Sequence, residues 1–255
     1  MCVIAIYRAK REKNENLRMM AIDNPDGTGA IWYNKEGIPC YKKGLTINQV
    51  LEMNKTLPMP YAFHFRITTV GHNKLLTHPY EVTKESKLAM EGSADQLLMH
   101  NGHWSDWNEA ILNNALCTGV NPPDGDWSDS RAMAYLGGQV GTNVLKMLTG
   151  QKIALFKKGR SIQVLGAGWS NEKEILYSNK NWEPSYTKGV WRDRGYYYAG
   201  EKKNEVATVP GTNVSEEPNG NQETAEPEQA EIPGMTAYEW DPIKKEVIAM
   251  KDKKA

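Results

Sequence analysis

The sequence begins with Met1-Cys2-Val3-Ile4-Ala5-Ile6-Tyr7, an apolar run that gives way to polar residues from Arg8 onward. A short run rich in β-branched and aromatic residues, bounded by polar or turn-forming residues, predicts a β-strand, so we expect residues 2–7 to form one. Similar runs, each bounded by Gly, Pro, Asn or Asp, recur at residues 29–33, 61–67, 96–100, 152–157, 161–165 and 174–177.

Apolar residues at helical spacing predict helices between these strands. The clearest lie at residues 46–57, behind a Thr cap, and at 129–148, behind Ser128, with a third at 106–116. We find no internal repeat and no Gly-rich phosphate loop. Because strands group around a few helices without regular βαβ alternation, we expect an α+β layered fold with largely antiparallel sheets.

The composition excludes several classes of function. The 255 residues include 31 Lys and Arg against 31 Asp and Glu, a net charge of zero. The basic surface that phosphate contacts require is therefore missing, and we do not expect a nucleic acid as direct ligand. No apolar run approaches the roughly 20 residues of a membrane span, so we expect no membrane association. The three cysteines lack Cys-x-x-Cys spacing, which favours reduced thiols and a cytosolic protein.

The composition of the chain changes near residue 200. Residues 201–234 are rich in Glu, Asn, Thr, Pro and Gly, so they cannot offset their ordering entropy, and we expect a disordered acidic linker. Residues 235–255 carry a few anchors such as Tyr238 and Trp240, which predict either a docking peptide or a frayed tail. The remaining residues, 1–200, are expected to form one domain with a single large core.

Cys2 is the first residue that could carry chemistry. A small second residue favours removal of the initiator Met, which would leave a cysteine with a free α-amine. A free thiol has a pKa of about 8.5 and an α-amine a pKa of about 7.7–8.0. Near neutral pH the amine can therefore accept the thiol proton, directly or through a water. The alternative is that Cys2 is a small buried apolar residue that opens a strand.

An arginine stands at the end of the predicted strand 61–67, in the stretch His64-Phe65-Arg66-Ile67-Thr68-Thr69-Val70-Gly71. The Arg66 guanidinium can hold a carboxylate through two parallel hydrogen bonds, and Thr68 or Thr69 can add a hydroxyl contact. The alternative is an arginine that forms a solvated ion pair.

His100-Asn101-Gly102 follows the apolar run Leu97-Leu98-Met99, and Asn-Gly after a strand first of all predicts a hairpin turn. The same turn could expose the Asn101 side-chain amide and the Gly102 N–H toward one point. Two such donors stabilise the oxyanion of an acyl-transfer intermediate. The two interpretations are compatible.

Two further stretches have a structural and a functional interpretation. Ser128-Asp129-Ser130 precedes a predicted helix, which favours helix capping with an acidic first turn. Alternatively, Asp129 pairs with a substrate ammonium group. Asp26-Gly27-Thr28-Gly29 predicts a turn, or backbone that lines a pocket.

In this order and spacing, these stretches resemble the class II glutamine amidotransferases, glutaminase domains of the N-terminal-nucleophile (Ntn) hydrolase superfamily. The resemblance covers about residues 2–182. It rests on Met1-Cys2, Asp26-Gly27-Thr28-Gly29, Arg66 to Gly71, His100-Asn101-Gly102, Ser128-Asp129-Ser130 and the late Tyr177-Ser178-Asn179. It implies a four-layer α/β/β/α sandwich of the Ntn-hydrolase type with two mainly antiparallel sheets, and it implies no cofactor.

The resemblance also implies the catalytic roles. Cys2 would be the nucleophile and its α-amine the base, while Asn101 and Gly102 would form the oxyanion hole. The side-chain amide of glutamine would be hydrolysed through a Cys2 thioester to give glutamate and ammonia.

Substrate binding and partners follow from the same resemblance. Arg66, supported by Thr69, would bind the glutamine α-carboxylate, and Asp129 would bind the α-ammonium group. The ammonia would pass to a separate acceptor enzyme, which the sequence does not identify, and the oligomeric state is left open.

Some features depart from the family, and other functions stay open. Val70 stands where many relatives have a polar residue, and Arg131 stands where an acidic residue is usual.

One alternative function is an Ntn amidohydrolase acting on another amide, although Arg66 and Asp129 would then be superfluous. Another is a catalytically inactive scaffold or binding protein. The five histidines form no standard ligand pattern, so we expect no metal.

Overall fold

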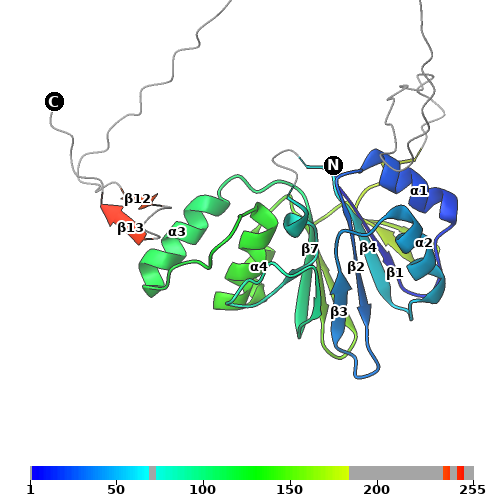
Figure 1. Cartoon of the computed structure of the whole chain (residues 1–255), viewed down its shortest axis with the longest axis horizontal. Helices are drawn as coiled ribbons and strands as arrows, with labels where there is room; N and C mark the ends of the chain where they lie inside the picture. The colour runs from blue at the N-terminus through cyan, green and yellow to red at the C-terminus, as the bar shows by residue number, and fades with distance from the viewer. Residues whose placement is uncertain (1, 69–72, 184–237, 242–245, 250–255) are drawn as a thin grey trace, which may run out of the picture.

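The computed structural model describes residues 2–68, 73–183, 238–241 and 246–249. Thr69 and the expected linker 201–234 lie outside these residues. The described part of the main domain contains two antiparallel sheets with helices on either side (Figure 1). The predicted α+β class with antiparallel sheets is therefore confirmed.

The larger sheet has seven strands. In spatial order they are β10 (Ser170–Glu172), β11 (Ile175–Tyr177), β1 (Val3–Tyr7), β4 (Tyr61–Phe65), β2 (Thr28–Tyr33), β3 (Pro39–Lys42) and β6 (Glu91–Ser93). The smaller sheet has four strands. In spatial order they are β5 (Tyr80–Glu81), β7 (Gln96–Asn101), β8 (Lys152–Lys157) and β9 (Ser161–Leu165).

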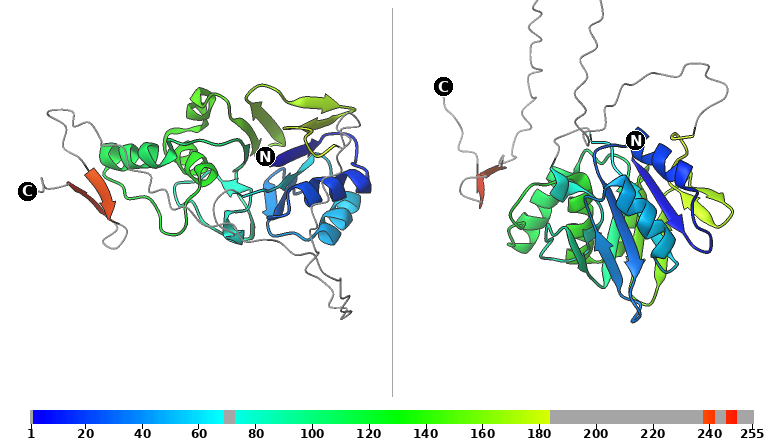
Figure 2. Two further views of the ribbon diagram at one scale, coloured as in Figure 1. Left: turned by 90° about the horizontal axis from the view of Figure 1, so that it is seen from above. Right: turned by 45° about the vertical axis from the view of Figure 1, so that its right-hand side comes forward.

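The two sheets pack face to face, and helices cover their outer faces (Figure 2). Helices α1 (Asn14–Asp23) and α2 (Ile47–Thr56) pack on the larger sheet. Helix α4 (Asp129–Val140) packs on the smaller sheet and against α3 (Trp107–Thr118). The layers therefore follow the order helix, sheet, sheet, helix.

Strand β1 lies inside this sandwich, which explains the apolar run at the start of the chain. Val3, Ala5 and Tyr7 face the helices α1 and α2, whereas Ile4 and Ile6 face the smaller sheet. All five side chains are fully buried. Successive side chains of a strand point to opposite faces, and here both faces are covered, so no polar residue interrupts the run.

Two of the predicted helices match closely, and a third is too long. Thr46 caps α2 through a reciprocal capping box with Gln49, as its position predicts. Helix α4 begins behind its Ser128 cap but ends at Val140 rather than continuing to 148. Gly141, with φ of 89°, leaves the helical conformation, and a separate 3₁₀-helix, η2 (Thr142–Met147), follows.

Other elements were not predicted. Helix α1 buries only Leu17 and Met20, and its cap residue Lys13 makes no side-chain capping bond, so neither periodicity nor capping marks it. Strands β3, β5, β6 and β10 have two to four residues each, and the exposed Glu91–Ser93 carries no apolar pattern. The hairpin predicted at Asn101-Gly102 is wrong. Strand β7 pairs with β5 and β8, so the chain after Gly102 continues toward α3 instead of turning back.

Near the C-terminus, β12 (Tyr238–Asp241) pairs antiparallel with β13 (Glu246–Ala249). The rest of 235–255 lies outside the described residues, and docking by this segment stays a prediction. Among the helices of the described residues, none is long and apolar enough to cross a membrane.

Candidate active site

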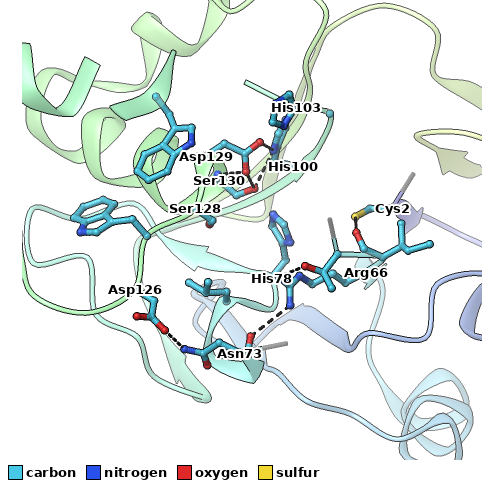
Figure 3. A pocket seen from close by; sticks show the side chains of 16 residues that line it. Cys2, Arg66, Asn73, His78, His100, His103, Asp126, Ser128, Asp129 and Ser130 are labelled. Atoms are coloured by element: carbon cyan, nitrogen blue, oxygen red, sulfur yellow. Dashed lines mark hydrogen bonds and ion pairs between the residues drawn. The ribbon is translucent and has the colours of Figure 1, made fainter. Parts of the chain in front are cut away.

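A cavity of about 420 Å³ opens where several elements end (Figure 3). It lies beside the start of β1, the end of β4, the end of β7 and the beginning of α4. Four of the six residues predicted to catalyse the reaction or bind the substrate line it: Cys2, Arg66, Gly102 and Asp129. Thr68, named as a possible hydroxyl contact, lines it as well. The topology thus brings together side chains that are up to about 130 positions apart in the chain.

Strand β1 positions Cys2 beside the end of β4, since Val3 is the antiparallel partner of Phe65. The thiol donates a hydrogen bond to the Ile67 carbonyl over 3.4 Å. The Cys2 carbonyl accepts a hydrogen bond of 2.6 Å from Asn179 Nδ2, which joins Cys2 to the segment after β11. Burial raises the pKa of the Cys2 thiol, although the Ile67 contact opposes this. The thiol therefore needs a base to become a nucleophile.

Arg66 is held by the turn Asp26-Gly27-Thr28-Gly29. Its backbone N–H donates to the Gly27 carbonyl over 2.8 Å, and its carbonyl accepts from the Asp26 N–H over 2.9 Å. The guanidinium donates to Thr68 Oγ1 at 3.0 Å and to the Asn73 carbonyl at 3.4 Å. Among the residues that the structure describes, no carboxylate pairs with it. The buried positive charge at this wall of the cavity is therefore uncompensated.

Asp129 is the first residue of α4, and backbone groups fix its carboxylate. Oδ1 accepts from the Ser130 N–H at 2.7 Å, and Oδ2 accepts from the Trp104 N–H at 3.2 Å. His100 Nδ1 lies 3.9 Å from Oδ2. Burial outweighs the nearby carboxylate and holds the pKa of His100 below its ordinary value, so the ring is neutral at pH 7 and this contact is no ion pair. Within the described chain the Asp129 carboxylate has no cationic partner.

A hydrogen-bonded chain behind the cavity fixes His100. Gln151 Nε2 donates to the His103 carbonyl at 2.9 Å, which turns Oε1 toward His100 Nε2, 2.8 Å away. Nε2 therefore carries the ring proton, and Nδ1 accepts from the Ser130 hydroxyl at 2.9 Å. Gly102 lies against this chain, because a Cβ there would come within 2.2 Å of Gln151 Oε1. A side chain at position 102 would therefore displace Gln151 or His100 from these hydrogen bonds.

Asn101 differs from the other predicted site residues because it is buried outside the cavity lining. Its side-chain amide donates to Ser178 Oγ at 2.8 Å, and the same oxygen accepts from the Ile4 N–H at 2.9 Å. The bond joins the end of β7 to the larger sheet. The oxyanion role of Asn101 and Gly102 stays a prediction, and Thr69 lies outside the described residues.

Arg131, noted in the sequence only as a departure, supports one wall of the cavity. It is 1% exposed, and its guanidinium donates to the Ser86 side chain and to the carbonyls of Ser86, Asp124 and Asp126. It also lies over the Trp127 ring, 4.2 Å from the ring centre. Asp126 and Trp127 line the cavity, so Arg131 fixes their loop to α4. The position directly after Ser-Asp-Ser was the only signal.

Further lining residues were not predicted: Asn73, Leu76, His78, His103, Trp107 and Trp127. Asn73 Nδ2 donates to the Asp126 carboxylate over 2.5 Å and so links two walls of the cavity. Among the described residues, no group of His, Cys, Asp and Glu side chains is arranged to hold a metal ion.

No protein-family model and no curated protein sequence matches this chain. Similar solved structures include the glutamine phosphoribosylpyrophosphate amidotransferase from B. subtilis complexed with ADP and GMP, at 15% identity and a TM-score of 0.46, covering 69% of this chain and 41% of that chain. A second is an allosteric regulatory enzyme of purine biosynthesis, at 16% identity and a TM-score of 0.39, covering 61% and 35%. A third is a glutamine aminotransferase class-II domain protein from Silicibacter pomeroyi, at 12% identity and a TM-score of 0.33, covering 69% and 87%.

The first of these neighbours is named a glutamine amidotransferase and the third a glutamine aminotransferase class-II domain protein, names that agree with the group that the order of the motifs predicted. The chain spans less than half the length of the first two. At such low identities and TM-scores the likeness concerns the fold alone, so the function has to be argued from the side chains of the site.

Proposed function

We propose that this protein is a glutaminase of the class II amidotransferase type, with Cys2 as its nucleophile. The observation that carries the proposal is a pair of opposite, uncompensated charges, Arg66 and Asp129, in the wall of the cavity that Cys2 also lines. A free amino acid carries a carboxylate and an ammonium group on the same carbon. A cation and an anion on one cavity wall match this pair of charges.

The volume of the cavity and the position of Cys2 in its wall limit the substrates that the site can accept. A cavity of about 420 Å³ is at the lower end of the range for small-molecule sites, and it accommodates an amino acid. With the α-groups held at Arg66 and Asp129, the side chain of glutamine is free to reach the Cys2 thiol. A substrate without both α-charges would leave two charges unpaired at the cavity, which is unfavourable.

In the proposed reaction, the α-amine of Cys2 takes the thiol proton while Sγ attacks the amide carbon of the glutamine side chain. The Gly102 N–H and the second hydrogen of the Asn101 amide, whose first hydrogen is donated to Ser178, stabilise the oxyanion. The C–N bond breaks, and the nitrogen takes the proton from the amine and leaves as ammonia. Water then attacks the thioester, which releases glutamate and restores the thiol.

The ammonia would be used by a separate acceptor enzyme, whose identity the site does not specify. A reducing compartment such as the cytosol is the one we expect, because the mechanism requires a reduced Cys2 and all three cysteines are free thiols.

The proposal is tested by glutamate release from L-glutamine and by intact mass before and after a glutamine-analogue electrophile. We expect wild-type protein to release glutamate, to lack Met1 and to gain one adduct at Cys2. Cys2→Ala should reduce release to background, whereas Cys40→Ala and Cys117→Ala, at the two other free thiols, should keep it.

Two results would favour the alternatives. A folded wild-type protein that binds L-glutamine without releasing glutamate would indicate an inactive binding protein. Release from another amide but not from glutamine would indicate a different amidohydrolase. An adduct at Cys40 or Cys117 would show that Cys2 is not the nucleophile.

A further inference from the structure

His78 lines the same cavity but is absent from the motif-based hypothesis. His78 is only 5% exposed. In the part of the chain that the structure describes, neither of its ring nitrogens has a hydrogen-bond partner. Buried polar groups without partners are rare and cost free energy, so each one requires an explanation.

Packing fixes the ring of His78 but does not satisfy its nitrogens. The ring packs against the His64 ring in a tilted arrangement with 3.9 Å between centres, and it lies edge to face with the Tyr80 ring at 5.1 Å. The backbone is fixed as well, because the His78 carbonyl lies where a Cβ on Gly29 would be, 1.8 Å from its ideal position. The turn that contains Gly29 also holds Arg66 through Gly27. One turn thus seats both residues at the cavity.

The ring lies next to the proposed carboxylate-binding residue. His64 lies in β4, and Arg66 directly follows Phe65, the last residue of that strand. The backbone of Arg66 continues the antiparallel pairing with Asp26 and Gly27, so the side chains of His64 and Arg66 point to the same side. Because the His78 ring packs against His64 and lines the same cavity as Arg66, it is a neighbour of the Arg66 side chain. Figure 3 shows His78 pointing into the cavity between Arg66 on one side and Ser128 and Asp129 on the other.

The charge state of the ring fits a hydrogen bond with an anion. Burial, reinforced by the neighbouring His64 and His100, holds the pKa of His78 well below its ordinary range. The ring is therefore neutral at pH 7, with one N–H donor and one acceptor nitrogen. A metal ion does not account for these nitrogens, because no metal-binding group of side chains is found among the described residues.

We propose that His78 is a further substrate-binding residue, whose ring N–H donates a hydrogen bond to the α-carboxylate held by Arg66. This inference rests on the proposed glutaminase function, and it names a residue that selects amino acids at their α end. In this proposal the substrate carboxylate supplies a hydrogen-bond partner that the ring lacks among the described residues.

The test compares His78→Phe with Thr77→Val. His78→Phe keeps a planar ring but removes both nitrogens. Thr77→Val removes the hydroxyl of the neighbouring residue. That residue is fully buried and does not line the cavity, and its hydroxyl has no hydrogen-bond partner among the described residues. KM and kcat for glutamate release are measured together with the thermal midpoint in the absence of substrate.

We expect His78→Phe to raise KM for glutamine about tenfold, the effect of one hydrogen bond to a charged group, with little change in kcat. Its thermal midpoint should stay level or rise, because two unpartnered polar atoms are removed. Thr77→Val should keep the wild-type KM. His78→Gln, which retains an N–H donor, should recover part of the lost affinity.

Wild-type KM in His78→Phe would overturn the inference. A raised KM accompanied by a large fall in thermal midpoint, in both His78→Phe and Thr77→Val, would also overturn it, since it would indicate a structural role. Either result leaves the proposed function intact as long as wild-type protein releases glutamate. If wild-type protein neither releases glutamate nor binds L-glutamine by calorimetry, the proposed function itself fails.

Discussion

Arg66 and Asp129 face one cavity without neutralising each other, and each is fixed by backbone contacts that a substrate does not have to displace. The fixed positions of these two side chains lower the free-energy cost of binding a substrate. The free energy of ordering the two charged groups is spent on folding rather than on binding, so a small zwitterion can bind with useful affinity.

The first prediction concerns these two charges. Arg66→Lys and Asp129→Asn should mainly raise KM for glutamine, with a smaller effect on kcat, because both contacts exist in the ground state and in the transition state. Steady-state kinetics on the two variants check this, with Arg160→Lys, outside the cavity lining, as the control. A fall in kcat at unchanged KM would assign these residues to the chemical step instead.

The second prediction concerns Asn101. Asn101→Ala should lower kcat by about 10²–10³ while changing KM little, as expected on loss of one oxyanion donor. Ser178→Ala is the matched control, because it removes the same Asn101–Ser178 hydrogen bond but keeps the amide donor. Equal losses of kcat in both variants would mean that Asn101 serves only to join β7 to the larger sheet.

At the scale of residues, the sequence motifs predicted part of the cavity lining. Cys2, Arg66, Gly102 and Asp129 could be found because each belongs to a short stretch with a chemical meaning. His78 could not, since its significance lies in burial and in missing partners. Those properties arise from segments that are distant in sequence.

At the scale of elements, the first turn of α4 combines three structural roles. Its N-terminal turn carries Asp129, caps itself with Ser128 and buries the Arg131 guanidinium against two loops. A single arginine is suited to this task, because its planar fork offers several donors in fixed directions.

The third prediction is that Arg131→Met destabilises the protein by roughly 2–4 kcal/mol, since it leaves buried carbonyl oxygens unpaired. Arg131→Lys should recover little of this, because one ammonium group cannot reach all the acceptors. Urea unfolding measures both effects, with Lys158→Met at an exposed site as the control. A loss below about 0.5 kcal/mol would show that the loops do not depend on Arg131.

The predictability of the elements varied with their burial. The strand at β1 was evident because both of its faces are covered and every residue from Val3 to Tyr7 is apolar. Helix α1 was not evident, because its contact with the core is made by Leu17 and Met20 among mostly polar neighbours. The Asn101-Gly102 dipeptide wrongly predicted a hairpin turn, because a turn signal is local. The pairing of β7 with β5 and β8 depends instead on the whole sheet.

On the scale of the whole molecule, the buried neutral histidines His64, His78 and His100 link stability to pH. Burial lowers the pKa of His64 to about 3, and it lowers the pKa of His78 and His100 as well. In the unfolded chain their pKa returns to about 6.5. The unfolded state therefore binds more protons below that pH, and the stabilisation present above pH 6.5 is lost as the pH falls toward the folded pKa values.

The fourth prediction follows from this linkage. The free energy of unfolding should decrease between pH 6.5 and pH 5, by up to about 1.4 kcal/mol per pH unit for each of the three rings. Urea titrations at pH 7, 6 and 5 check this. His78→Phe, which has one such ring fewer, should show a shallower slope. A free energy that stays constant from pH 7 to pH 5 would contradict the prediction.

The pairing of β1 with β11 also determines the order in which the site can be made. Every described residue that lines the cavity lies before position 131, so a ribosome has synthesised these residues when only about half of the 255 positions have been translated. Yet Ile4 is bound to Ser178, 174 positions away, and Cys2 to Asn179. Such long-range pairing forms late, after most of the loop-closure entropy has been lost. Until β11 emerges, one edge of the Cys2 strand stays open, so a nascent chain that already contains the described cavity residues has not yet formed the site.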